Sequence, residues 1–249
     1  MAVYETARVR EGAPRKGTAT AVSYRSTYSL DDRVAVSNPK SDRTSEQFPV
    51  MQMNWIERYA MDRMPQQEMV SSVLAVDSID GHIPGLASKV DFSQQGWSGQ
   101  LFHQLLFDAS GVRSHQYSYF ENEGDEQITL AYPNDGMSAD ALWFWVRGMA
   151  APALQPGETK RVMLLNSLVE ARTRHRALKW QRAVVGCHPE TESVGKRTAT
   201  RWTVDVEGGV KQVFLVEASS PFAVLHWESS EGERADLVSV RRIGGLAGK

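Results

Sequence analysis

The alternation of apolar and polar positions along the chain predicts a protein built mainly from antiparallel strands. The clearest example is the segment 198–206, whose even positions are mostly apolar and whose odd positions are mostly polar. This period of two places one face of a strand in a core and the other in water. Gly208-Gly209 follows as a two-residue hairpin turn. If Glu207 pairs with Val210 across this turn, the apolar faces coincide, and the predicted cross-strand pairs are Trp202 with Leu215 and Val204 with Val213.

Similar β-prone segments, separated by turn signals, cover most of the chain. They are expected at residues 18–24, 26–36, 68–77, 96–108, 112–122, 126–132, 159–165, 168–176, 180–187, 222–228 and 234–242. Two other regions are not predicted to form strands. Residues 1–16 suggest an extended arm, and Met51–Met64 allows a short amphipathic helix after a loop at 37–47. We therefore expect an arm at 1–16 and one β domain at 17–249, with a long loop or short helical insertion near 37–67.

One short segment, Ser138–Arg147, is apolar on nearly every side and predicts a buried helix. Ser138 is a suitable N-cap, and Asp140 lies in the first turn, where the helix dipole favours a carboxylate. Trp143 and Trp145 give the helix large apolar surfaces, for which the inside of a strongly curved antiparallel sheet is the natural place. The predicted fold is thus mainly β: a single strongly curved antiparallel sheet, forming a half-barrel or open barrel, with one short buried helix.

A hairpin between Trp97 and Phe120 is rich in histidine and aromatic residues. The connection Ala109-Ser110-Gly111 suggests that Phe107 pairs with Arg113, which makes His103 and His115 diagonal neighbours on one face. Imidazole titrates near neutral pH, and a phenol beside it can relay a proton. The candidate catalytic residues are therefore His103, His115 and Tyr117, with Arg113 holding an anionic substrate. The alternative is a solvent-exposed face of stacked aromatic side chains.

Arginine alternates along the segment 168–176 at Arg172, Arg174 and Arg176. In a strand these guanidinium groups share one face, where they suit a carboxylate, phosphate or sulfate, although Glu170 on that face can neutralise them. The candidate ligand-binding residues are Trp97, Tyr119, Trp143, Trp145, Arg172 and Arg174.

Composition narrows the classes of function. The net charge of −2 provides no global field for nucleic acid, and no run of about 18 apolar residues predicts a membrane span. The six histidines and the single Cys187 show no metal-ligand spacing, and no nucleotide-binding glycine motif occurs. We expect no metal and no cofactor. No signal peptide is visible, so the expected compartment is cytoplasmic if Met1 is native and periplasmic if it replaces an earlier start.

The order of elements in the second half carries a resemblance. A loop at Asp135–Ala139 enters the short helix at Leu142–Arg147, and the connector Leu154–Gly157 follows. A β meander then contains Gly195-Lys196-Arg197 and closes on Pro221–Trp227. An acidic glycine turn leads from there to Leu237–Arg242. Over roughly residues 97–245 this order resembles an uncharacterised, mostly exported bacterial family of curved β-sheet domains. The resemblance implies a fold like that of the lipoprotein-localisation carriers, an unclosed barrel around a helical plug with an apolar cavity.

Three hypotheses for function remain open. The first is a binding or carrier protein that holds an apolar or lipidic small molecule in the concave face of the sheet, where tryptophan and methionine supply adaptable apolar surface. The second is a lyase, isomerase or hydrolase for an anionic substrate. The third is a structural subunit that docks a partner protein.

Overall fold

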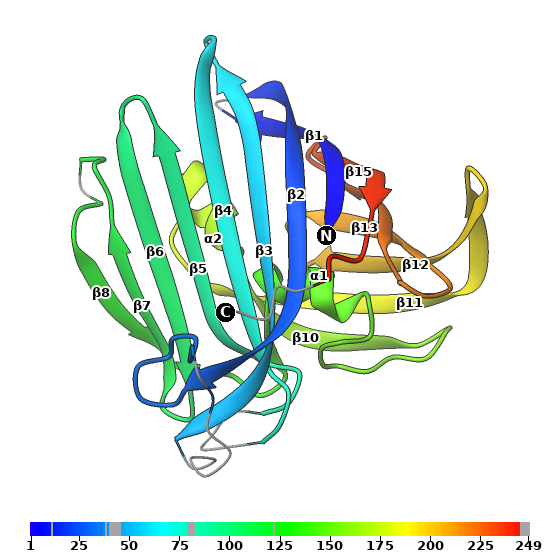
Figure 1. The fold of residues 1–249 in the computed structure, drawn as a ribbon, viewed down its shortest axis with the longest axis horizontal. Coiled ribbons are helices and arrows are strands. Elements are labelled where there is room, and N and C mark those ends of the chain that lie inside the picture. Colours follow the sequence, from blue (N-terminus) through cyan, green and yellow to red (C-terminus); the bar gives the residue numbers. More distant parts are fainter. Residues whose placement is uncertain (11, 38, 40–45, 79–82, 122, 245–249) are drawn as a thin grey trace.

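The computed structural model describes residues 1–10, 12–37, 39, 46–78, 83–121 and 123–244. In this part of the chain fifteen strands form one sheet, in the order β8-β7-β6-β5-β4-β3-β2-β1-β15-β14-β13-β12-β11-β10-β9 (Figure 1). They span Ala2–Arg10 (β1), Ala13–Ser29 (β2), Gln47–Met61 (β3), Met64–Ala75 (β4), Ala87–Gly96 (β5), Gly99–Asp108 (β6), Gly111–Tyr117 (β7), Glu126–Leu130 (β8), Gly136–Ser138 (β9), Thr159–Leu165 (β10), Trp180–Val194 (β11), Arg197–Val206 (β12), Lys211–Glu217 (β13), Val224–Ser229 (β14) and Arg234–Val240 (β15).

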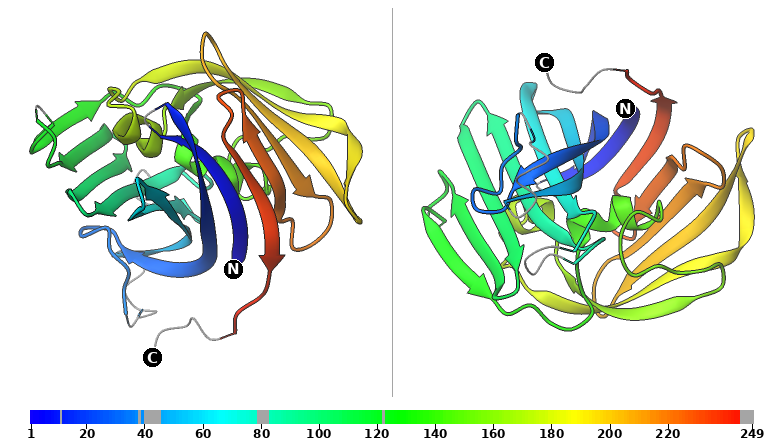
Figure 2. Two further views of the ribbon diagram at one scale, coloured as in Figure 1. Left: turned by 90° about the horizontal axis from the view of Figure 1, so that it is seen from above. Right: turned by 60° about the horizontal axis from the view of Figure 1, so that its bottom comes forward.

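The sheet is open and strongly curved. Neighbouring strands are antiparallel, except that β9 and β10 are parallel, and β8 and β9 are the two ends of the order. Seen from above, the strands curve around a concave side that contains both α-helices (Figure 2). The predicted fold class, a single curved sheet with a short buried helix, is confirmed.

The first strand lies in the middle of the sheet, because β1 pairs with β2 on one side and with β15 on the other. The prediction of an extended arm at residues 1–16 is therefore wrong. Tyr4, Thr6 and Arg10 are buried on the side of β1 that faces the core, and their mixture of apolar and polar side chains hid the period of two. The N-terminal segment thus connects the part of the sheet from β2 to β8 with the part from β15 to β9.

Residues 51–64 also differ from expectation. They lie in β3 and its turn to β4, and β3 pairs with β2 and β4 along its length, so the alternative of a helix here is wrong. Trp55 and Tyr59 are four residues apart, which fits one face of a strand as well as one face of a helix. The segment forms a strand because its backbone pairs with β2 on one side and with β4 on the other. The predicted loop at 37–47 lies largely outside the described residues.

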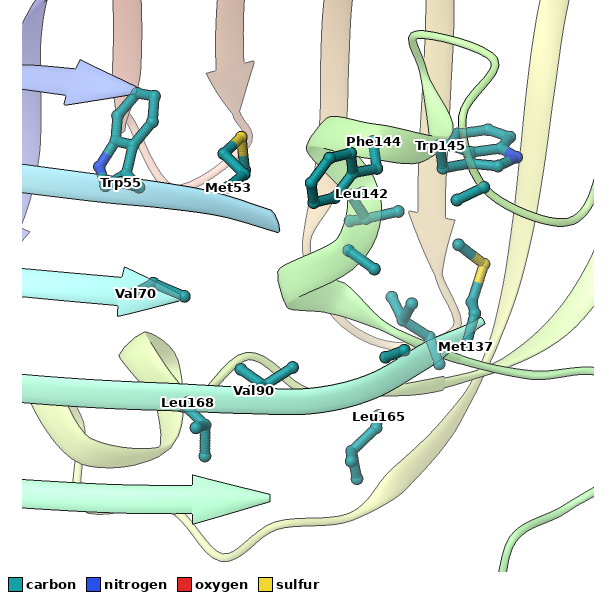
Figure 3. Packing of buried hydrophobic residues seen from close by; sticks show 14 of the residues in the cluster. Met53, Trp55, Val70, Val90, Met137, Leu142, Phe144, Trp145, Leu165 and Leu168 are labelled. Atoms are coloured by element: carbon teal, nitrogen blue, oxygen red, sulfur yellow. The ribbon is translucent and has the colours of Figure 1, made fainter. Parts of the chain in front are cut away.

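A short helical element fills the concave side, and we call it the plug. It consists of the 3₁₀ turn Ala139–Ala141 (η1) and the helix Leu142–Trp145 (α1), and Ser138 caps it by accepting a hydrogen bond from the Asp140 backbone N–H at 3.3 Å. Phe144 and Trp145 are fully buried in the central core. Figure 3 shows these side chains on the helix, with Met137 and Leu165 from the neighbouring strands.

A second helix stands where a strand was predicted. Residues Leu168–Thr173 form α2, with Ser167 as N-cap accepting from the Val169 backbone N–H at 3.1 Å. Leu168 and Ala171 bury its inner face completely. The strand prediction for 168–176 is wrong because the alternating arginines imitated a strand face. The spacing of Ser167 and Glu170, typical of a helix N-terminus, was the missed signal.

The C-terminal hairpin forms, but one residue out of the predicted register. Trp202 pairs with Phe214 and Val204 pairs with Gln212. The Val206 backbone N–H donates to the Val210 carbonyl at 3.2 Å, so the loop contains three residues instead of two. The extra residue brings Phe214, which is fully buried, into the core.

Candidate functional site

The register of the hairpin between β6 and β7 decides the position of the predicted acid–base residues. His103 pairs with Gln116 and His115 pairs with Gln104, so the two histidines point to opposite faces of the sheet. The predicted register is wrong by one residue. The turn is shorter than expected, because the Asp108 carboxylate accepts a hydrogen bond from the Ser110 backbone N–H at 2.9 Å and Asp108 pairs directly with Gly111.

His103 lies in the core beneath α2. Its side chain is 1% exposed, its Nε2 lies 2.7 Å from Ser114 Oγ, and its Nδ1 has no partner. Burial is the main cause that lowers the pKa of His103 to about 3, and the positive charge of Arg172 adds to it. A neutral imidazole held in this way is a structural group of the core.

His103 is therefore expected to stay uncharged from pH 5 to 8. Its folded pKa lies below the unfolded value of about 6.5, so only the unfolded state gains a proton as the pH falls below that value. This histidine should make the protein less stable in acid. Its ring resonances in NMR spectra should not titrate over this pH range, and a midpoint between pH 6 and 7 would contradict the assignment.

The other members of the predicted catalytic set lie on the outer face. The His115 ring bonds to Asp125 at 2.9 Å and lies 4.4 Å from the ring of Tyr117, which is 48% exposed. Arg113 is exposed and pairs with Asp108 at 3.3 Å. Since His103 faces the core, the structure does not bring the four groups together around one cavity.

The predicted ligand-binding residues divide into three groups. Trp97 is 70% exposed at the turn between β5 and β6, and Tyr119 bonds to Ser98 beside it at 3.0 Å. Trp145 and Arg172 have structural contacts: Trp145 Nε1 donates to the Pro152 carbonyl at 2.7 Å, and Arg172 binds Gln116 and Glu123. Only Trp143 and Arg174 line the same cavity.

That cavity, which we call the tryptophan pocket, opens on the concave side beside the plug. It has a volume of 120 Å³. The ring of Trp143 lies 4.5 Å from Trp55 and 6.4 Å from Trp227, centroid to centroid. The three tryptophans come from the plug, β3 and β14, so elements distant in the sequence build one aromatic wall.

A network of buried ion pairs adjoins this aromatic wall, with Arg8 and Arg10 lining the cavity. Arg8 Nε lies 3.0 Å from Glu57, and Arg10 Nη2 lies 2.7 Å from Glu68. Glu233 bonds to Arg10 at 3.1 Å and lies 3.5 Å from Arg8. Each guanidinium is satisfied by carboxylates, which is the condition under which buried charge is tolerated.

Asp140 connects the pocket to both helices. Its side chain accepts hydrogen bonds from the Ser167 hydroxyl at 2.6 Å and from the Leu168 backbone N–H at 3.0 Å, so it also caps α2. Burial raises the pKa of Asp140 to about 6, although these two hydrogen bonds oppose the shift. The carboxyl group thus changes charge in a mildly acidic range.

A second cavity, which we call the end cleft, lies near the turn between β6 and β7, where Phe107, Asp108 and Ala109 line it. It has a volume of 650 Å³. Its walls are largely apolar, with Phe107, Tyr132 and Met137 inside and Ile83 and Leu86 at the rim. Three charged groups at its edge are paired: Lys160 binds Asp135 at 2.7 Å, and Asp108 binds Ser110 and Arg113.

Sequence reasoning missed most residues of both cavities. Arg8 lies in the supposed arm, Trp55 in the supposed helix, and Trp227 in a strand whose face was not assigned. The available signal was the alternation of Tyr4, Thr6, Arg8 and Arg10, which is a strand pattern with charged inward positions.

Within the described residues, no group of three or more His, Cys, Asp or Glu side chains is arranged to hold a metal ion. Among the helices in the same part of the chain, none has the length and apolar character needed to cross a membrane.

No family model matches this chain, and no curated protein matches it. Its fold is similar to the crystal structure of a β-barrel-like protein from Brucella abortus, a domain of unknown function, DUF1849. The two share 11% sequence identity with a TM-score of 0.51, and the likeness covers 95% of this chain and 94% of the other. It shows an uncharacterised β-barrel-like fold.

Proposed function

We propose that this protein is a non-enzymatic binding protein that holds an apolar or lipidic small molecule in the end cleft. The observation that carries the proposal is the combination of volume and lining. A volume of 650 Å³ lies within the range of about 300–1,000 Å³ typical of small-molecule sites, and such sites are mostly apolar with few polar groups. The order of elements in the sequence predicts a resemblance to a carrier fold, and a carrier fold would suit this function.

The proposed site lies at the strand ends because the plug fills the centre of the concave side. Phe144 and Trp145 occupy the centre of the concave side, where the sequence suggested an open cavity. The apolar space lies at the strand ends, where the buried side chains of Met137 and Phe107 line the end cleft. Methionine and aromatic side chains adapt to irregular apolar ligands, which suits a lipidic or aromatic molecule.

Aspartate at the rim should weaken binding of an apolar fluorophore such as N-phenyl-1-naphthylamine. We expect Ile83→Asp to reduce affinity roughly tenfold, because a charge replaces apolar contact area. Fluorescence titration measures the affinity. The matched control is Val238→Asp, since Val238 is 60% exposed outside the cleft and Ile83 is 59% exposed at its rim.

The control variant should bind like the unaltered protein. Equal loss in both variants, or failure of the unaltered protein to bind the fluorophore, would contradict the proposal. Mass spectrometry of an organic-solvent extract of the purified protein then identifies any natural ligand.

A further inference from the structure

The tryptophan pocket is separate from the end cleft and has a different chemistry. It lies where β1 and β14 approach their turns, whereas the end cleft lies near the turn between β6 and β7. The two cavities share no lining residue. A ligand of the tryptophan pocket must therefore be considered independently of the proposed function.

The aromatic wall already stabilises one positive charge. The Arg8 guanidinium lies 4.6 Å from the ring centroid of Trp227 and 5.8 Å from that of Trp55. Cations within about 6 Å of an indole ring are attracted by its electron-rich face. No arginine or lysine in the described chain lies over the ring of Trp143, which lines the cavity and is only half-buried.

The charges around the cavity favour a further cation. Three arginines line it, against four carboxylates: Asp140, Glu170, Glu231 and Glu233. Glu57 and Glu68 stand behind Arg8 and Arg10, and Arg176 binds Glu170 from outside at 2.7 Å. Six carboxylates thus face four guanidinium groups, so an anionic ligand is repelled and a cationic ligand is attracted.

We infer that the tryptophan pocket is a second binding site, for a small organic cation that carries a quaternary or protonated amine. The cation contacts the part of the Trp143 side chain that lines the cavity, beside the rings of Trp55 and Trp227, and the surplus of carboxylates holds it. The volume of 120 Å³ limits the ligand to a molecule of a few heavy atoms, since an apolar cavity of about 150 Å³ admits benzene.

Choline and its uncharged analogue 3,3-dimethyl-1-butanol separate charge from shape, because both have the same branched outline. Isothermal titration calorimetry of the full chain should show roughly tenfold tighter binding of choline. Equal affinities, or tighter binding of the alcohol, would mean that shape alone is recognised. Binding of neither molecule would also overturn the inference.

Two rim variants test the role of charge with opposite expected signs. Arg174 and Glu231 pair with one another, and their side chains are 20% and 31% exposed. We expect Arg174→Gln to tighten choline binding roughly threefold and Glu231→Gln to weaken it by a similar factor. Structural damage would weaken binding in both variants, and the same direction of change in both would contradict the inference. Tighter binding of acetate than of choline would do so as well.

Discussion

Replacing Trp145 by alanine is expected to cost about 3–5 kcal/mol of folding free energy. The side chain is 1% exposed and meets the ring of Trp202 edge-on at 5.0 Å. Its indole N–H donates to the Pro152 carbonyl at 2.7 Å, so the substitution leaves a cavity and an unpaired acceptor. Chemical denaturation followed by circular dichroism measures the loss.

The control for this prediction is Trp97→Ala. Trp97 is 70% exposed, and its loss should change the free energy of unfolding by no more than about 0.5 kcal/mol. A similar cost in both variants would contradict the view that the plug, rather than aromatic content in general, stabilises the curved sheet.

The buried ion pairs beside the tryptophan pocket should be similarly sensitive. Arg10→Met is expected to destabilise the protein by about 3–5 kcal/mol, because it leaves the carboxylate of Glu68 buried without its partner. The side chains of Arg10 and Glu68 are 4% and 3% exposed. Glu233 loses a hydrogen bond at the same time.

Adding Glu68→Gln to Arg10→Met should restore at least half of the lost free energy. Glutamine removes the uncompensated charge and still accepts a hydrogen bond from the Tyr59 hydroxyl. The exposed pair of Lys211 and Asp205 gives the comparison: Lys211→Met should cost less than about 1 kcal/mol. A double variant as unstable as Arg10→Met would show that packing, not charge, dominates.

Much of the fold could be predicted from the period of two. The sequence predicts the strand Thr159–Leu165 with its observed bounds, and it predicts Ser138 as the cap of the plug. Long-range pairing was not available from the same pattern. The expectations for 1–16 and 51–64 failed because only sheet formation with β15, β2 and β4 decides between an arm, a helix and a strand.

The candidate sites were harder to predict than the fold. A shift of one residue in the pairing of β6 with β7 places His103 and His115 on opposite faces of the sheet. The Asp108 side chain sets that pairing at the turn. Trp143 and Arg174 were identified, but their partners Trp55 and Trp227 reach them only through the curvature of the whole sheet. Local spacing carries no information on such contacts.

Methionine methyl groups test most directly the proposal that an apolar molecule binds in the end cleft. Met137 lines that cleft and Met53 lines the tryptophan pocket, so methionine methyl resonances report on the two cavities separately. Addition of N-phenyl-1-naphthylamine to protein labelled at methionine methyls should shift the Met137 resonance and leave that of Met53 in place. A shift confined to Met53, or no shift at Met137 at saturating fluorophore, would contradict the account.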